Sequence, residues 1–276
     1  METAPEPGIH YEQAGNVLRV VGIWNAIILR GPLTAVTADA IIAEQVAFFR
    51  SLCPAADAHR PARDTASTVP PGTDSAVEWK VYGHDMPADL GRRLAAAGFQ
   101  PEEPETLMVF DLARGLPGAP TKSSAGPGVV VRRVSDRAGL ADFTVAAGTA
   151  FGRDAAWQAN RIAQYETRLT DPAVGLYVAY ANRRPVASAR VDFPPGRSFA
   201  GLWGGGTIPG YRGRGIYRAL VRVRAEEARR RGYRYLRVDA RDTSRPILER
   251  LGFIALTPII EWRLDLTTDL GPTQHK

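Results

Sequence analysis

The stretch from Gly201 to Phe253 constrains the fold more than any other part of this sequence. It reads as a strand, a glycine-rich turn, a helix, a second strand and a second helix. The turn, GYRGRG at residues 210–215, alternates glycine with arginine and comes directly before an apolar period at Ile216, Leu220 and Val223. This spacing predicts a helix that starts at the end of the turn.

The start of that helix predicts an anion site. The first N–H groups of a helix have no intrahelical acceptor, and they lie at the positive end of the helix dipole. Here they are flanked by the guanidinium groups of Arg212, Arg214 and Arg218. Orphan donors and cations in one place favour a phosphate or pyrophosphate. We therefore predict that residues 210–217, called the glycine-arginine turn below, bind a polyanion.

Two common phosphate loops fit the turn poorly. A Walker loop requires Lys followed by Ser or Thr after its last glycine, where this sequence has Ile216 and Tyr217. The dinucleotide fingerprint needs a third glycine for close helix packing, and Arg218 stands there. Neither class of nucleotide site is favoured.

A third pattern fits better. The segments IPGYRGRGIYRAL, RGYRYLRVDA and SRPILERLGF resemble the GNAT superfamily of N-acetyltransferases, whose cofactor motif is written (Q/R)xxGx(G/A). Gly213 and Gly215 occupy the two small positions, while Gly210 stands where Gln or Arg is usual. The resemblance covers roughly residues 129–266. It implies a mixed α/β fold that uses acetyl-coenzyme A as co-substrate.

The resemblance also implies which residues hold that co-substrate. Backbone N–H groups from Arg212 to Tyr217 are expected on the pyrophosphate, and a backbone N–H in the preceding strand is expected to polarise the thioester carbonyl. Glycines at 204–206 would let the thioester approach the backbone closely, although they also fit a bulge in an ordinary strand. The expected coenzyme-binding residues are Gly206, Thr207, Ile208, Arg212, Gly213, Arg214, Gly215, Ile216 and Tyr217.

Proton transfer has fewer candidates. Many members of the family place a tyrosine four residues before the glycine of the GF pair, where it protonates the departing thiolate, but this sequence has Leu248 there. We therefore expect a thiolate that leaves directly or is protonated through water, which a thiol pKa of about 8.5 permits. Asp239 is the candidate base, and Ser244 is a polar candidate that can alternatively cap a helix. Further candidates are Asp192, Glu78, His84 and Asp85.

An internal repeat divides the chain into two related halves. Residues 94–112 align without a gap with residues 248–266. We predict a degenerate GNAT-like domain at 1–112, a linker at 113–128 and an acetyltransferase domain with the coenzyme site at 129–276. The fold class is α/β (α+β), with two GNAT-like mixed-sheet domains in tandem. The identical positions are Leu94, Gly98, Phe99, Pro104, Asp111 and Leu112, each repeated 154 residues later.

The first half lacks a glycine-arginine turn. Its corresponding region is interpreted as the loop at 54–75, which is rich in Pro, Ala and Asp. The first half is then either a packing partner or a contributor to the acceptor pocket, with packing the favoured interpretation. The other predicted elements are strands within 16–30, 77–82, 129–134 and 199–207, helices at 38–52, 89–97, 136–147 and 155–169, and a hairpin at 176–193.

Composition limits the remaining function classes. No apolar run approaches the roughly 18 residues of a membrane span, and the start METAPEPGIH does not match a signal peptide, so the cytoplasm is expected. Cys53 is the only cysteine and no Cys/His spacing suggests zinc. The net charge of +6 comes largely from arginines between 212 and 245, near the predicted turn, so a nucleic-acid partner is only a minor alternative.

The function predicted from the sequence is transfer of an acetyl group from acetyl-coenzyme A to the amine of a small molecule. In the family that the chain resembles, the two helices expected at 136–169 line the acceptor site. One alternative is a non-catalytic acyl-coenzyme A-binding or scaffold protein, suggested by the missing tyrosine. Another is an enzyme that uses a longer acyl-coenzyme A or acylates a protein amine. No motif identifies the acceptor or the oligomeric state.

Overall fold

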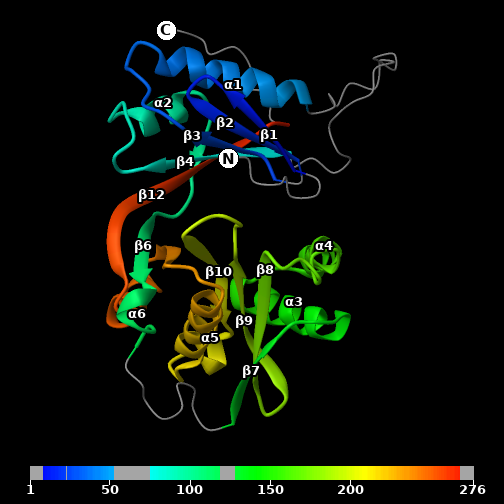
Figure 1. The fold of residues 1–276 in the computed structure, drawn as a ribbon. Coiled ribbons are helices and arrows are strands. Elements are labelled where there is room, and N and C mark those ends of the chain that lie inside the picture. Colours follow the sequence, from blue (N-terminus) through cyan, green and yellow to red (C-terminus); the bar gives the residue numbers. More distant parts are fainter. Residues whose placement is uncertain (1–8, 23, 53–74, 119–127, 268–276) are drawn as a thin grey trace. The chain divides into compact units, whose positions relative to one another are not determined.

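The computed structural model describes residues 9–22, 24–52, 75–118 and 128–267. The predicted loop at 54–75 and much of the predicted linker lie outside the described residues. The chain forms two compact units, which are described one at a time (Figure 1). Unit 1 is residues 1–105 with 257–276, and unit 2 is residues 106–256.

Unit 2 contains residues 201–253, the stretch of sequence that constrains the fold most. Its sheet has the order β6-β11-β10-β9-β8-β7. Strands β7 to β10 pair antiparallel in succession, whereas β10 pairs parallel with β11. The elements are β6 (Glu105–Asp111), β7 (Val129–Arg133), α3 (Arg137–Phe151), α4 (Ala155–Glu166), β8 (Val174–Ala181), β9 (Arg184–Asp192), β10 (Phe199–Thr207), α5 (Ile216–Arg230), β11 (Tyr235–Arg241) and α6 (Arg245–Arg250), with short 3-10 turns at Leu112–Arg114 and Pro209–Tyr211.

Local chemistry explains these boundaries. Asp136 caps α3, because its Oδ1 accepts a hydrogen bond of 2.7 Å from the Gly139 amide. The β8–β9 hairpin turns through Asn182 and Arg183, both with positive φ, as its two-residue turn requires. Alternate residues of β8 face opposite sides of the sheet. Leu176 and Val178 pack in one cluster with residues of α3, while Tyr177 and Ala179 pack in the cluster that includes α5.

Unit 1 repeats part of this plan. Its strands have the order β1-β2-β3-β4-β12, and β3 pairs parallel with β4 as β10 does with β11. The predicted strands within 16–30 are confirmed as two, β2 and β3, and the structure adds β1, which the sequence reading missed. The elements are β1 (Ile9–Ala14), β2 (Val17–Gly22), β3 (Ala26–Leu29), α1 (Ala38–Leu52), β4 (Ala76–Tyr82), α2 (Leu90–Ala96), β5 (Gln100–Pro101) and β12 (Ile254–Asp265).

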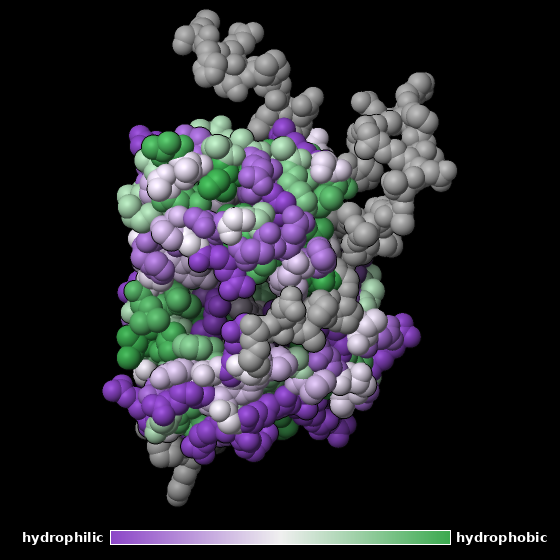
Figure 2. Space-filling view, turned by 45° about the horizontal axis from the view of Figure 1, so that its top comes forward, coloured by the Kyte–Doolittle hydropathy of each residue, from purple (hydrophilic) through white to green (hydrophobic). Residues whose placement is uncertain are grey.

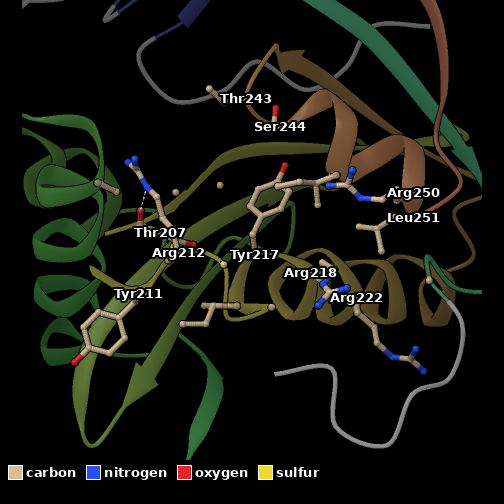
Figure 3. A pocket seen from close by; sticks show the side chains of 18 of the residues that line it. Thr207, Tyr211, Arg212, Tyr217, Arg218, Arg222, Thr243, Ser244, Arg250 and Leu251 are labelled. Carbon is tan, nitrogen blue, oxygen red and sulfur yellow. Dashed lines mark hydrogen bonds between the residues drawn. The ribbon is translucent and has the colours of Figure 1, made fainter. Parts of the chain in front are cut away.

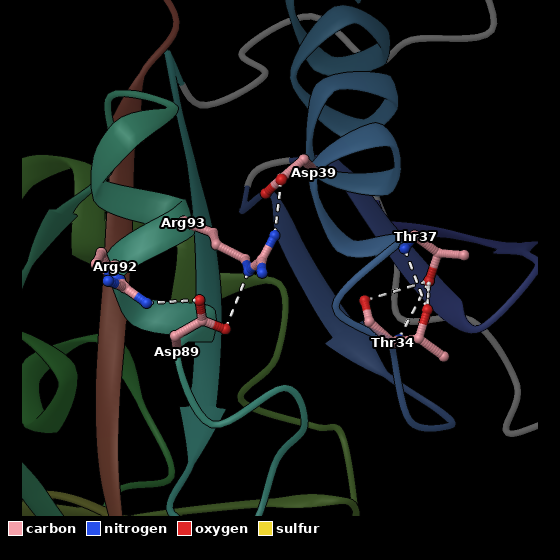
Figure 4. Close-up of polar contacts among 6 residues, drawn as sticks. All are labelled: Thr34, Thr37, Asp39, Asp89, Arg92 and Arg93. Atoms are coloured by element: carbon pink, nitrogen blue, oxygen red, sulfur yellow. Dashed lines mark hydrogen bonds and ion pairs between the residues drawn. The ribbon is translucent and has the colours of Figure 1, made fainter.

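Helices α1 and α2 of unit 1 are joined by an ion pair as well as by the core. Arg93 on α2 donates to Asp89 at the start of the same helix and to Asp39 on α1, at 3.0 and 2.7 Å (Figure 4). These contacts keep the pKa of the Asp89 carboxyl below its ordinary value, chiefly through the hydrogen bond from Arg93. The side chains of Trp79 and Phe99 meet edge to face in the buried core beneath.

The structure corrects one correspondence between the halves. The helix before β4 is α1, which answers to α5 before β11, so the counterpart of the glycine-arginine turn is residues 30–37. The loop at 54–75 was the wrong counterpart because it follows α1 in the chain instead of leading into it. Within the described residues, unit 1 has no counterpart of β7, α3 and α4.

The repeated residues have matching structural roles. Gly98 and Gly252 both follow a short helix with φ near 95°, at 95° and 94°. Asp111 and Asp265 each accept a hydrogen bond from the amide two residues further on, at 2.9 and 2.8 Å. Each half therefore ends with the same glycine conformation after its short helix and the same aspartate–amide hydrogen bond.

The last strand of each half belongs mainly to the unit formed by the other half. Strand β6 falls almost wholly within unit 2, and β12 pairs with β4 in unit 1. The compact units therefore do not coincide with the halves of the repeat. The division into domains at 1–112 and 129–276 stays a prediction.

None of the described helices is both long and apolar enough to span a bilayer. On the face shown in Figure 2, hydrophilic residues are spread widely over the described surface, and hydrophobic residues lie among them in small groups.

Candidate functional site

Strands β10 and β11 diverge at the centre of unit 2. Their parallel register covers Phe199–Gly201 against Tyr235–Arg237, and within the described residues it does not continue beyond Gly201. On its other side, β10 stays paired with β9, with an irregularity between Trp203 and Gly206. The split leaves a wedge between the carboxyl ends of the two strands.

Three consecutive glycines shape the wedge, each in its own way. Gly204 has a φ of +55°, which confirms the bulge that the sequence offered as an alternative. A Cβ on Gly205 would lie 3.0 Å from Cε2 of Tyr217, and one on Gly206 would lie 2.8 Å from the Phe151 ring. The space beside these two glycines is thus filled by side chains of the protein itself.

The glycine-arginine turn presents a row of backbone donors. The amides of Tyr211 and Arg212 bond to Ile208 O and Pro209 O, and the next backbone bond is from the Ala219 amide to Gly215 O. Within the described residues, the N–H groups of residues 213–218 have no backbone acceptor. Helix α5 begins at Ile216, as predicted, and its N-cap Gly215 provides no side-chain cap. The donors are available to a ligand.

Only glycine suits the two small positions of the turn. Gly213 and Gly215 have φ values of +75° and +79°, in the left-handed region that side chains avoid. A Cβ on Gly213 would meet nothing within 4 Å, so the turn is open on this side. Glycine is needed here for the backbone conformation, and the open space lets a bulky anion approach.

A cavity of about 920 Å³ joins the turn to the wedge. Arg212 points toward it and donates from Nε to Thr207 O at 3.1 Å (Figure 3). Arg218 and Arg222 on α5 and Arg250 on α6 add further positive charge to its lining. Other lining residues come from the end of α3 (Ala150, Phe151), from β10 (Gly205, Gly206, Thr207) and from the β11–α6 connection and α6 (Thr243, Ser244, Ile247).

The structure brings together most of the predicted coenzyme-binding residues, but not all in the expected way. Ile208 lies in the core with only 7% of its surface exposed, and its amide donates to Val186 O. The Arg212 amide is used within the turn, so its side chain is the group that reaches the cavity. Arg214 does not line the cavity and its guanidinium lies over the Tyr211 ring. Those lining the cavity are Gly206, Thr207, Arg212, Gly213, Gly215, Ile216 and Tyr217.

Of the two catalytic candidates, only Ser244 lines the cavity. Asp239 is ion-paired with Arg237 at 3.3 Å, its side chain is only 2% exposed, and it does not line the cavity. Ser244 does line it (Figure 3). Its hydroxyl donates to Arg241 O instead of capping α6, so the alternative helix-cap role is not formed. Leu248 is fully buried in the core of unit 2.

Sequence reasoning missed the side chains of Tyr217 and Arg224. Tyr217 was considered only for its backbone, yet its phenol projects into the cavity toward Ser244 (Figure 3). Arg224 is 1% exposed and donates to three backbone carbonyls, of Leu220, Arg190 and Trp203. A lone arginine on the apolar face of a predicted helix was the only signal for it in the sequence.

Comparison with known proteins gives a family for this site. Residues 142–253 match the model of the acetyltransferase (GNAT) family. This segment contains the wedge, the glycine-arginine turn and α6, and the match confirms the resemblance noted in the sequence. No curated protein matches the chain significantly in sequence.

Solved structures resemble the chain over most of its length. A GCN5-related N-acetyltransferase from Kribbella flavida has a TM-score of 0.63 and 15% identity, covering 93% of this chain and 90% of that chain. Another from Sphaerobacter thermophilus has a TM-score of 0.61 and 17% identity, covering 91% and 77%. A tandem GNAT protein from the clavulanic acid biosynthesis pathway has 0.60 and 13%, covering 98% and 86%. At these identities the likeness is one of fold, and it confirms the predicted mixed α/β class.

Proposed function

Residues 142–253 are a GNAT-type acetyltransferase domain by their match to the family model, and we propose that the protein transfers an acetyl group from acetyl-coenzyme A to the amine of a small molecule. The observation that carries this proposal is the row of N–H groups at 213–218, which have no backbone acceptor in the described chain and open on an arginine-lined cavity. The cytoplasm is the expected compartment.

The residues present fit the coenzyme. Its pyrophosphate would take the N–H donors of the turn, with the Arg212 side chain beside them. Arg218, Arg222 and Arg250 would face the 3′-phosphate on its ribose. The uncharged pantetheine arm would follow the cavity past Ile216 and Ile247 toward the wedge. When bound there, the coenzyme supplies an activated acyl group, and the protein holds it and the amine in line.

The acceptor amine has to be neutral before it attacks, so a base or water must take its proton. Asp239 does not line the cavity, which leaves water-mediated transfer as the way in which it would act. Ala150 and Phe151 line the cavity from the end of α3. They would meet the acyl end of the ligand.

A second candidate function is coenzyme binding without catalysis. It is favoured by Leu248, which places a buried aliphatic side chain where many family members have a proton donor. The two functions share the coenzyme site and differ in turnover.

One experiment separates them. The protein is mixed with acetyl-coenzyme A and a library of small amines, and release of free thiol is followed with a thiol reagent. Coenzyme binding is measured in parallel from the rise in melting temperature, which follows mass action. Thiol release with at least one amine supports the transferase. Binding of the coenzyme without thiol release, whether small amines or a protein substrate are added, supports the non-catalytic function.

A further inference from the structure

Tyr217 lies across the mouth of the wedge. It is the second residue of α5, and its ring edge approaches the backbone of β10 so closely that a Cβ on Gly205 would lie 3.0 Å from Cε2. Its hydroxyl is directed toward Ser244, in the segment that follows β11 (Figure 3). The phenol is therefore held between the two diverging strands.

A buried cation accompanies the phenol. Arg224 lies two turns further along α5, and its Nη2 would be 3.5 Å from the same Cβ on Gly205. All three of its hydrogen bonds go to carbonyl oxygens, and no carboxylate in the described chain pairs with it. Burial lowers the pKa of Arg224 to about 10, opposed by Tyr217, so it remains charged at neutral pH. An unneutralised cation here favours negative charge at the wedge.

The phenol keeps its proton at neutral pH. Burial raises the pKa of Tyr217, while the Arg224 cation and the neighbouring Ser244 hydroxyl act in the opposite direction. The β10 side of the ring presents Gly205, which cannot ionise. The other charged groups that line this cavity are Arg212, Arg218, Arg222 and Arg250.

Position 248 has no access to this place. Leu248 is fully buried and packs with the core that includes Leu220 and Val238. A proton donor for the wedge must come from another element, and Tyr217 is the phenol that lines the cavity at that point.

We propose that the hydroxyl of Tyr217 donates the proton to the sulfur of the departing coenzyme A, in place of a side chain at position 248. This inference rests on the proposed function. As the amine nitrogen bonds to the acyl carbon, the carbon–sulfur bond breaks and its electron pair goes to sulfur. The nitrogen releases one proton to water, the phenol proton passes to that sulfur, and the tyrosinate regains a proton from water. Arg224 acts as a positioning residue that stabilises the negative charge on either oxygen or sulfur.

The test uses the full-length protein and Tyr217→Phe, which keeps the ring against Gly205 and removes only the hydroxyl. The matched control is Tyr233→Phe, because the Tyr233 hydroxyl donates to Pro194 O and does not line the cavity. Turnover with an accepted amine should fall about 100-fold in Tyr217→Phe, as for the loss of a general acid. Its Kd for coenzyme A should change by less than about threefold, since a hydrogen bond to the departing sulfur is made mainly during the reaction.

A second readout needs no turnover. The pKa of the thiol in bound coenzyme A is measured from the ultraviolet absorbance of the thiolate. A phenol that donates a hydrogen bond to the thiolate lowers the thiol pKa. Without that hydroxyl, in Tyr217→Phe, the thiol pKa should rise by about one unit, and it should stay unchanged in Tyr233→Phe.

A fall in turnover together with a higher thiol pKa supports the proposal. Unchanged turnover and thiol pKa would overturn it, as would a loss of affinity that accounts for the whole fall in turnover while the thiol pKa stays constant. If the wild-type protein binds no coenzyme A, the proposed function itself fails, and this inference fails with it.

Discussion

The turns before α1 and α5 occupy corresponding places in units 1 and 2, and they treat their helix N-termini in opposite ways. Each follows a strand that pairs parallel with the strand after the helix. Before α1, Thr34 and Thr37 cap each other through amides and hydroxyls, and Thr34 O also accepts from the Thr37 and Ala38 amides (Figure 4). Before α5, the donors of residues 213–218 have no backbone acceptor in the described chain.

The comparison separates a phosphate site from an ordinary helix start. Every helix has a positive N-terminal dipole, so the dipole alone does not select one of the two. At α1 the amides of Ala38 and Ile41 bond to the carbonyls of Thr34 and Thr37, and the amides of the two threonines bond to each other's hydroxyls. At α5, glycines with positive φ and arginines along the cavity leave the donors for a polyanion. We infer that the second half kept the ligand site and that the first half closed it.

The largest effect is expected from closing the α5 turn. Gly213→Glu adds a negative charge among the donors and forces a side chain into a φ of +75°. Coenzyme A affinity should fall about 100-fold or more, because like charges oppose each other there. Calorimetric titration measures it. Gly210→Glu is the matched control, since it adds the same charge just outside the donor row, and its loss should be much smaller. Equal losses in both variants would contradict a site centred on residues 213–218.

The sequence predicted the turn well because its signal is local. Glycine at 213 and 215, the arginines and the apolar period from Ile216 placed the start of α5 correctly. The position of the Tyr217 phenol was not predictable, because it depends on how closely β10 approaches at Gly205. Likewise, the engagement of the Arg212 amide depends on the 3-10 turn before it. The counterpart turn in unit 1 was misplaced because a long insertion after α1 obscured the alignment.

The next largest effect is expected at the repeated leucines. Leu94 and Leu248 are both fully buried, so a tyrosine at either position overpacks its core. Each substitution should lower the free energy of unfolding by about 1–3 kcal/mol, measured by denaturant unfolding. Leu248→Tyr should not raise turnover, because the new side chain enters the core. A large gain in turnover would show that position 248 does reach the reacting groups.

A smaller effect is expected from opening the α1 turn. Thr34→Ala removes the hydroxyl that accepts from the Thr37 amide at 3.1 Å. It should cost about 1 kcal/mol of stability, as the loss of a cap usually does. Coenzyme A affinity should stay at the wild-type value. New binding of inorganic phosphate or coenzyme at α1 would show that threonine capping alone distinguishes the two turns.

The smallest effect is expected from single arginines. Arg218 lines the cavity. Arg218→Ala should lower coenzyme A affinity about threefold, which is the size of effect expected for one exposed charge pair. Arg214→Ala is its control, because Arg214 stacks on Tyr211 and does not line the cavity. A greater loss of coenzyme A affinity in Arg214→Ala than in Arg218→Ala would show that Arg214 does bind the coenzyme, as the sequence predicted.

Amide hydrogen exchange with and without coenzyme A tests most directly whether the α5 turn is the open site and the α1 turn the closed one. Residues 213–218 should exchange more slowly when the coenzyme is present, because its phosphates accept their N–H groups. Residues 34–41 should exchange at the same rate in both states. Unchanged exchange at 213–218 in protein saturated with coenzyme, or equal slowing in both turns, would contradict this assignment.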